Sequence, residues 1–162
     1  MSKAQRLSDR EVVFTRLVDA PREQVWQVWT EMEHLHRWWG PAGFTTTTHE
    51  FAFVPDGEWR FIMHGPDGTD YPNRIVFREI DPPSRLVYQN GWDALGAPLD
   101  FTVVVTFVPD LGKTRFSMHM TFRDAESLRK AVELYGVLPG GTQTLDRLAD
   151  YVEGRPANGA RS

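Results

Sequence analysis

The sequence predicts an α+β fold in which a curved antiparallel sheet of about six to seven strands wraps around a long C-terminal helix. Two changes of hydrophobic period predict this order. Helical spacing of apolar residues near the N-terminus gives way to alternation between Phe44 and Phe122, and helical spacing returns after Asp124. Short turns between the alternating segments favour an antiparallel meander, because parallel strands need long crossover connections.

One strand and two short helices are expected first. Residues 12–18 are rich in β-branched side chains and read as the strand. Pro21 then suits the start of a helix, where its missing N–H has no cost. The first helix presents Val25, Val28, Trp29 and Met32 on one face, and the second presents Leu35, Trp38 and Trp39 before Gly40-Pro41 ends it.

The central segment alternates apolar and polar residues, which is typical of strands with one buried face. Turn signals such as Pro55-Asp56-Gly57 and Asp81-Pro82-Pro83 separate these strands. The residues predicted to face inward are Phe51, Phe53, Trp59, Phe61, Met63, Ile75, Phe77, Leu86, Tyr88, Phe101, Val103, Val105, Phe107, Phe116, Met118, Met120 and Phe122.

The last segment reads as one long helix that is interrupted at residues 136–141. Leu128 to Tyr135 and Leu145 to Val152 each carry an apolar stripe, which needs the apolar face of the sheet as its partner. We therefore predict a single domain over residues 11–153, with residues 1–10 and 155–162 as flexible tails.

Composition excludes several classes of function. The 162-residue chain has no cysteine, so disulfides, thiolate metal sites and a cysteine nucleophile are excluded. A net charge of -4 with scattered Lys and Arg does not suit nucleic acid. The polar first ten residues are not a signal peptide, and no stretch is long enough to span a bilayer. We expect a cytoplasmic protein.

A strongly twisted sheet curls, and a helix in its concave side leaves room for a cavity at one end, which we expect near the first two helices and the Trp38-Trp39 segment. The high aromatic content, 12% with six Trp, favours such a space. The side chains predicted to form a ligand-binding wall are Trp38, Trp39, Phe61, Met63, Phe77, Tyr88, Asn90, Trp92, Met118, Met120, Leu134 and Leu138.

Three features of this wall each have two interpretations. Trp38-Trp39-Gly40-Pro41 is either a lid over the cavity or a helix end plugged by two indoles. The inward methionines are either an adaptable binding surface or ordinary core filling. The polar group of Asn90, on the strand that also carries Tyr88 and Trp92, either orients a ligand or belongs to a turn at a strand end.

Neither a metal site nor a catalytic frame emerges. His34 and His36 are two residues apart on a helix and so point to different faces, while the other histidines lie on separate strands. Glu50, Glu58, Asp93 and Asp100 stand in no recognisable catalytic frame, and no nucleophile elbow or phosphate loop occurs. We expect no metal and no cofactor.

Several segments occur in a specific order along the chain. They are Ala20-Pro21 with Val25, Trp26 and Trp29, then Trp38-Trp39-Gly40-Pro41, Gly57-Glu58-Trp59-Arg60, Gly65-Pro66-Asp67-Gly68 and residues 143–148. Together they resemble the activator of heat-shock protein 90 ATPase-like family of the START-like (SRPBCC, birch-pollen-allergen-like) superfamily. The resemblance covers about residues 11–153 and implies the helix-grip fold with a hydrophobic cavity. Family members often carry Trp where this chain has Gly141.

Three functions follow as hypotheses. The first is binding of a small hydrophobic or aromatic ligand without a reaction. The second, implied by the resemblance, is a co-chaperone-like interaction module, although those activators also use a separate N-terminal domain for which one 162-residue fold has no room. The third is a cavity enzyme of the polyketide cyclase or hydrolase type, and it rests on superfamily analogy. A homodimer through an exposed sheet edge is a further alternative.

Overall fold

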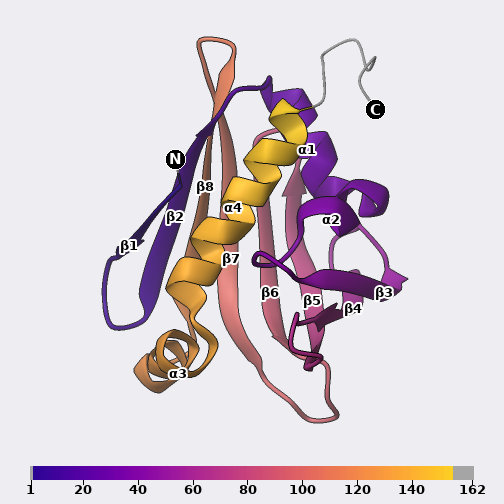
Figure 1. The fold of residues 1–162 in the computed structure, drawn as a ribbon, viewed down its shortest axis with the longest axis vertical. Helices are drawn as coiled ribbons and strands as arrows, with labels where there is room; N and C mark the ends of the chain where they lie inside the picture. Colours follow the sequence, from indigo (N-terminus) through magenta and orange to yellow (C-terminus); the bar gives the residue numbers. More distant parts are fainter. Residues whose placement is uncertain (1, 155–162) are drawn as a thin grey trace.

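The computed structural model describes residues 2–154, whose strands form one antiparallel sheet of eight strands in the order β1-β2-β8-β7-β6-β5-β4-β3 (Figure 1). Each strand pairs antiparallel with its neighbours. The strands are β1 (Lys3–Arg6), β2 (Glu11–Val18), β3 (Thr45–Phe51), β4 (Glu58–His64), β5 (Asp70–Asp81), β6 (Arg85–Trp92), β7 (Leu99–Asp110) and β8 (Lys113–Phe122).

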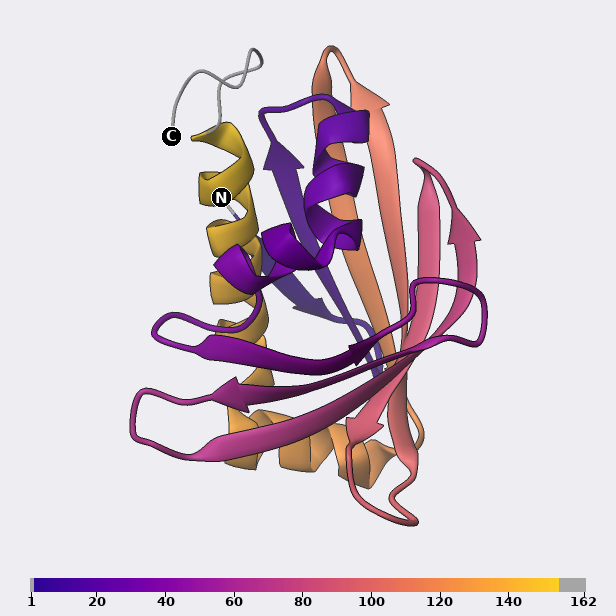
Figure 2. The same cartoon turned by 90° about the vertical axis from the view of Figure 1, so that its right-hand side faces the viewer.

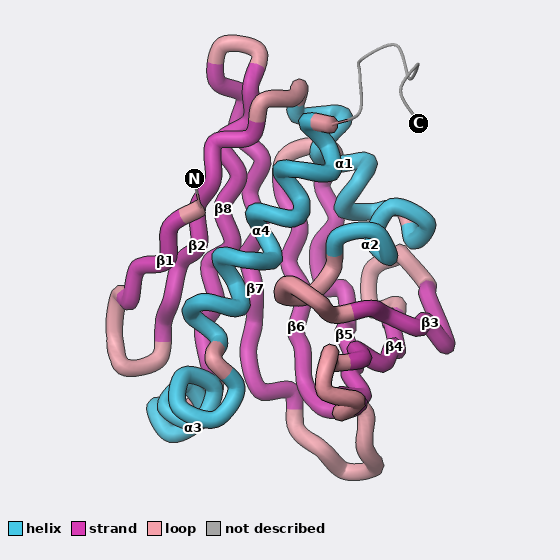
Figure 3. Tube along the Cα trace, viewed as in Figure 1, coloured by secondary structure: helices cyan, strands magenta, loops and turns pink. Residues whose placement is uncertain are grey.

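The helices of the described chain all lie on the concave side of this sheet, as Figure 2 shows. The first two connect β2, next to one edge, with β3 at the other edge, so they cross the sheet. The helices are α1 (Arg22–Thr30), α2 (Met32–Trp38), α3 (Ala125–Tyr135) and α4 (Val137–Glu153). The tube in Figure 3 shows α4 running along the sheet, while α1 and α2 cover its upper part.

Local irregularities bend the sheet around the helices. The strand register shifts between Thr48 and Glu50 in β3, between Phe77 and Glu79 in β5, and next to Asn90 in β6. A β-bulge of this kind bends its strand and increases the local twist. The curvature therefore comes from three defined positions as well as from the ordinary twist of strands.

The core lies between the concave face and the helices, and the alternation of the strands supplies it. In β8, for example, Thr114, Phe116, Met120 and Phe122 are buried. The largest fully buried side chains are Trp29, Trp38, Trp59, Tyr88, Phe14, Phe61, Phe77, Phe107, Phe116, Leu35, Ile75 and Leu86.

Gly136 separates α3 from α4. Its φ of 59° and ψ of 44° are left-handed values, which glycine adopts without a steric penalty and which commonly end helices. The predicted interruption over residues 136–141 is thus a break at one residue, and α4 begins at Val137. Pro139 fits in the first turn of α4, where the backbone N–H groups have no helical acceptor.

The structure confirms the predicted fold class, the two short helices and the long C-terminal helix, and it corrects the strand number. The additional strand is β1, which pairs with residues 12–15 of β2. Residues 1–10 are predicted as a flexible tail, and this prediction is wrong for Lys3–Arg6, which form β1. All four β1 residues are exposed, so an edge strand forms there through its backbone alone. The predicted tail at residues 155–162 lies outside the described residues.

No helix within residues 2–154 is both long enough and apolar enough to span a bilayer.

Candidate functional site

A cavity of about 740 Å³ lies between the concave face of the sheet and the helices. Its walls come from the middle of the sheet, from α3, from the first turns of α4 and from the segment over residues 39–44. This volume is within the range of small-molecule sites, about 300–1,000 Å³. The cavity lies beside the long helix and borders the segment after Trp38, as expected. The expected position near the first two helices is wrong, because no described residue of α1 or α2 lines the cavity.

Nine of the twelve side chains predicted for the wall line this cavity. They come from the 39–44 segment, from β4, β6 and β8, and from α3: Trp39, Phe61, Met63, Tyr88, Asn90, Trp92, Met118, Met120 and Leu134. Asn90 lies inside β6, not in a turn.

The remaining three, Trp38, Phe77 and Leu138, are not among the described residues that line the cavity. Trp38 is fully buried in the core, where its Nε1 donates a hydrogen bond to the Val28 carbonyl at 2.9 Å. Phe77 packs on Phe53, with ring centroids 4.9 Å apart. Leu138 is partly buried against the core. Successive residues of a helix point in different directions, so Leu138 does not lie on the cavity side of α4.

The predicted wall lacks several lining residues, among them Phe14 of β2 and the paired glycines of α4. Gly140 and Gly141 face the cavity, so this turn of α4 adds no side chain to it. The Phe14 ring packs directly on Gly141, where an added Cβ would lie 2.3 Å from a ring carbon. Gly141, where the resemblance implies a tryptophan, is the position in the sequence that marks this contact.

The closed end of the cavity is a cluster of indoles around Trp39. The Trp39 ring centroid lies 5.4 Å from that of Trp29 and 4.9 Å from that of Trp59. Trp38 also contacts it, at 5.5 Å. Trp39 is only 8% exposed, so the Trp38-Trp39 pair fills this end of the fold and one of its two rings forms the cavity wall.

The open end is bordered by a chain of aromatic contacts, which we call the aromatic rim: Phe44, Tyr71, Trp92 and Tyr135. Ring centroids are 5.9 Å apart between Phe44 and Tyr71, 6.3 Å between Tyr71 and Trp92, and 5.6 Å between Trp92 and Tyr135. Tyr135 is 56% exposed. The rim therefore joins the sheet, α3 and the 39–44 segment at the surface.

Arg147 of α4 holds the segment that follows α2. Its Nη1 donates to the carbonyl oxygens of Gly40 and Pro41, each at 2.8 Å, and of Trp39 at 3.3 Å. These carbonyls follow the end of α2, where helical donors are lacking. Partial burial lowers the pKa of Arg147. The sequence analysis did not single out this residue, because nothing local to it shows that distant carbonyls need a donor.

Two polar side chains of β6 face the cavity. Tyr88 is 2% exposed, and its hydroxyl forms no hydrogen bond with a residue that the structure describes. Burial raises the pKa of Tyr88, so the phenol stays protonated at neutral pH. The Asn90 Nδ2 donates to the Arg74 carbonyl at 3.1 Å and to Asn73 Oδ1 at 3.2 Å.

Charged residues that line the cavity lie near the start of α3. Arg123 pairs with Asp100 at 3.1 Å and with Asp124 at 3.2 Å. Glu126 and Lys130 are exposed on α3. The inner part of the cavity, around Tyr88 and Trp39, is therefore uncharged among the described residues.

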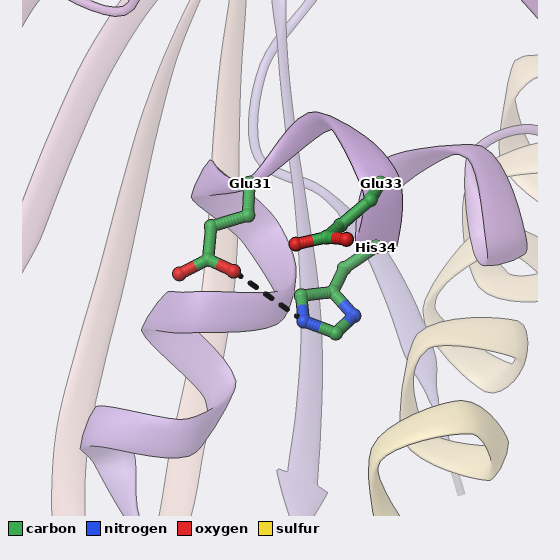
Figure 4. Close-up of side chains that lie close together, drawn as sticks. All are labelled: Glu31, Glu33 and His34. Carbon is green, nitrogen blue, oxygen red and sulfur yellow. Dashed lines mark ion pairs between the residues drawn. The ribbon is translucent and has the colours of Figure 1, made fainter. Parts of the chain in front are cut away.

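A separate cluster of titratable groups lies where α1 meets α2. Donor atoms of Glu31, Glu33 and His34 come within 4.8 Å of one another, with His34 Nε2 3.4 Å from Glu31 Oε1 (Figure 4). The other ring nitrogen, Nδ1, is 2.7 Å from the Tyr151 hydroxyl. Histidine spacing alone does not predict this cluster, because its other two members are glutamates. Its three donors fall short of the four ligands of a structural zinc site, and none lines the cavity.

Comparison with known proteins places the chain in a family. The model of the "Activator of Hsp90 ATPase homolog 1-like protein" family matches residues 19–153. No curated protein matches the chain.

Solved structures share the fold over nearly the whole chain. A protein from Arthrobacter aurescens is 27% identical with a TM-score of 0.86, and the alignment covers 98% of this chain and 95% of that one. A protein from Mycobacterium smegmatis is 24% identical with a TM-score of 0.84, covering 94% and 97%. The AHSA1 protein from Silicibacter pomeroyi is 22% identical with a TM-score of 0.73, covering 90% and 99%.

Proposed function

Because the chain belongs to the activator of Hsp90 ATPase homolog 1-like family and its own fold leaves a cavity beside α4, we propose that it binds a small hydrophobic molecule there. The single observation that carries this proposal is the cavity of about 740 Å³ in a part of the fold that a packed core would fill. Interiors otherwise hold few voids larger than a water molecule.

The chemistry of the walls supports an apolar guest. Aromatic side chains such as Trp39, Phe61 and Phe101 and the methionines Met63 and Met118 line the space. Burial of an apolar ligand against them is favourable by about 25 cal/mol for each Å² removed from water. Methionine adapts its shape easily, which suits a site that accepts related ligands.

Binding without a reaction agrees better with these walls than catalysis does. The lining residues within the described chain include no histidine, and their carboxylates, Asp100, Asp124 and Glu126, belong to the charged region at the start of α3. A general acid or base needs a titratable group at the reacting atoms. Tyr88, which is the buried titratable group of the wall, has a raised pKa and holds its proton.

The test uses the neutral fluorophore N-phenyl-1-naphthylamine and a pair of matched variants. Ala131 of α3 lines the cavity, whereas Ala125 at the start of the same helix is exposed and does not. We expect saturable binding to the unmodified protein, at least tenfold weaker binding to Ala131→Phe, and unchanged binding to Ala125→Phe. Absence of saturable binding to the unmodified protein, or equal affinity in both variants, would contradict the proposal.

The name of the matched family supports a second candidate, stimulation of a chaperone ATPase. The steady-state ATPase rate of an Hsp90 chaperone, measured with and without this protein, tests it. A saturable rise in rate would support this function, and an unchanged rate at a large excess of the protein would exclude it.

A further inference from the structure

The inner end of the cavity contains polar groups that the protein itself leaves unused. The Tyr88 hydroxyl has no hydrogen-bond partner in the described chain, although the residue is 98% withdrawn from solvent. It is not among the fully enclosed polar atoms that lack a partner, so it remains accessible on the cavity side. A buried hydroxyl without a partner is costly, and it points to a water molecule or a ligand as its normal partner.

Asn90, two residues further along β6, offers a second group on the same face of the strand. Its Nδ2 is held by the Arg74 carbonyl and by Asn73 Oδ1. The Arg74 carbonyl can accept a hydrogen bond but cannot donate one, so the Asn90 atom that faces it must be the amide nitrogen. The nitrogen therefore points toward β5. The Asn90 Oδ1 is then left without a donor from the described residues, beside the register shift at Asn90 and Gly91.

These two groups have complementary capacities. A protonated phenol donates one hydrogen bond and can accept another, whereas the free amide oxygen only accepts. Raised by burial, the Tyr88 pKa keeps the phenol in its donor form. A ligand hydroxyl could use both groups, by accepting from Tyr88 and donating to Asn90, and a carbonyl could use Tyr88 alone.

No cation is available at this end to bind an anionic group. The lining cations within residues 2–154 are Arg123 and Lys130, both exposed, and Arg123 already pairs with Asp100 and Asp124. A carboxylate beside Asn90 Oδ1 would lose its hydration and face another acceptor. The polar groups therefore select a neutral oxygen.

We infer that the ligand is an apolar molecule with a neutral hydroxyl, such as a phenol or an alcohol, which enters with that group first and binds between Tyr88 and Asn90. This inference rests on the proposed cavity function and adds the chemical class and orientation of the ligand. The Tyr88 ring also packs on Trp29, with centroids 5.4 Å apart, so the hydroxyl is held on a fixed ring. Its position depends little on the ligand.

Equilibrium dialysis with naphthalene, 2-naphthol and 2-naphthoate tests the inference on the whole chain. The unmodified protein should bind 2-naphthol roughly two- to a hundredfold more tightly than naphthalene, as expected for one or two neutral hydrogen bonds. The charged 2-naphthoate should bind more weakly than 2-naphthol.

The decisive variant is Tyr88→Phe, which removes only the hydroxyl and keeps the ring in the core. It should reduce the preference for 2-naphthol over naphthalene at least twofold, because only the hydrogen bond to Asn90 then remains, and it should leave naphthalene binding unchanged. Tyr151→Phe is the matched control, because Tyr151 hydrogen-bonds to His34 and does not line the cavity. It should retain the preference of the unmodified protein.

The outcomes separate the two proposals. Equal affinities for naphthalene and 2-naphthol, or a preference that Tyr88→Phe leaves undiminished, would overturn the inference and leave the hydrophobic cavity function standing. Tighter binding of 2-naphthoate than of 2-naphthol would also overturn it. If none of the three compounds binds, the inference fails together with the proposed function.

Discussion

The two ends of the space between sheet and helices are built from the same strands but are filled differently. At the closed end, Trp29 of α1, Trp38 of α2 and Trp39 directly after α2 pack on one another. Trp39 also packs on Trp59 of β4. At the open end, α4 contributes Gly140 and Gly141, and α3 contributes the small side chain of Ala131. Bulky indoles thus close one end, while missing or small side chains leave the other open.

This difference shows that the cavity does not follow from the sheet alone. A curved sheet only sets the distance to the covering helices, and the residues of those helices decide whether the distance is filled. The closed end should therefore carry more of the stability, and the open end should tolerate larger changes.

The largest expected effect comes from Trp38→Ala at the closed end. Trp38 is fully buried and donates to the Val28 carbonyl, so its truncation should lower the free energy of unfolding by about 3–5 kcal/mol. Met118→Ala at the open end should cost less than about 2 kcal/mol, because Met118 already borders empty space. Urea unfolding followed by fluorescence or circular dichroism measures both.

Equal losses in these two variants would contradict the comparison, since they would mean that the cavity wall is packed as tightly as the indole cluster.

An intermediate effect, of opposite sign at neighbouring positions, is expected for the two glycines of α4. Alanine is the better helix former, so Gly140→Ala should raise the free energy of unfolding by up to about 1 kcal/mol. There is room for the added Cβ, which would lie 3.4 Å from Pro41. Gly141→Ala would place Cβ 2.3 Å from the Phe14 ring and should destabilise by about 1–3 kcal/mol. Thermal unfolding of both variants measures the contrast.

A gain in stability at both positions would show that the Phe14 ring moves into the cavity at no cost, and the open end would then be more adaptable than we infer.

The smallest effect concerns Asp124, which caps α3 beside the open end. Its carboxylate accepts from the Ser127 N–H at 2.7 Å, and this bond lowers the pKa of Asp124 below its usual value. Because the folded state has the lower pKa, the cap stabilises at neutral pH and is weakened as the pH falls through that pKa. Asp124→Ala should therefore have a lower melting temperature than the unmodified protein at pH 7, and the difference between the two melting temperatures should become smaller in acid.

Asp124→Asn is the control, because asparagine caps a helix without titrating. A gap between the unmodified protein and Asp124→Ala that is independent of pH would show that the carboxylate charge contributes nothing to the end of α3.

The sequence predicted the fold because its signals are local and repeated. Alternation in residues such as Phe116 to Phe122 identifies strands, and the stripe from Leu145 to Val152 identifies the long helix. β1 was not predicted, because an exposed edge strand needs only backbone pairing and so leaves no hydrophobic alternation in the sequence.

The candidate site was predictable where side chains alternate along one strand, as for Tyr88, Asn90 and Trp92 of β6. It was not predictable where the site depends on distant partners. Arg147 and Phe14 act on segments more than 100 residues away, and neither position differs locally from an ordinary helix or strand residue. Phe77 was misplaced because alternation gives the face of the sheet but not the position along its curve.

The bonds of Arg147 have a mechanical consequence. One guanidinium nitrogen serves three successive carbonyls, so the segment cannot lift away from α4 one residue at a time. Trp39 and Gly40, which line the cavity, are therefore held to the same helix whose glycines leave the cavity open. A displacement of α4 that widens the cavity would also pull on residues 39–41 through Arg147, so the two walls move together.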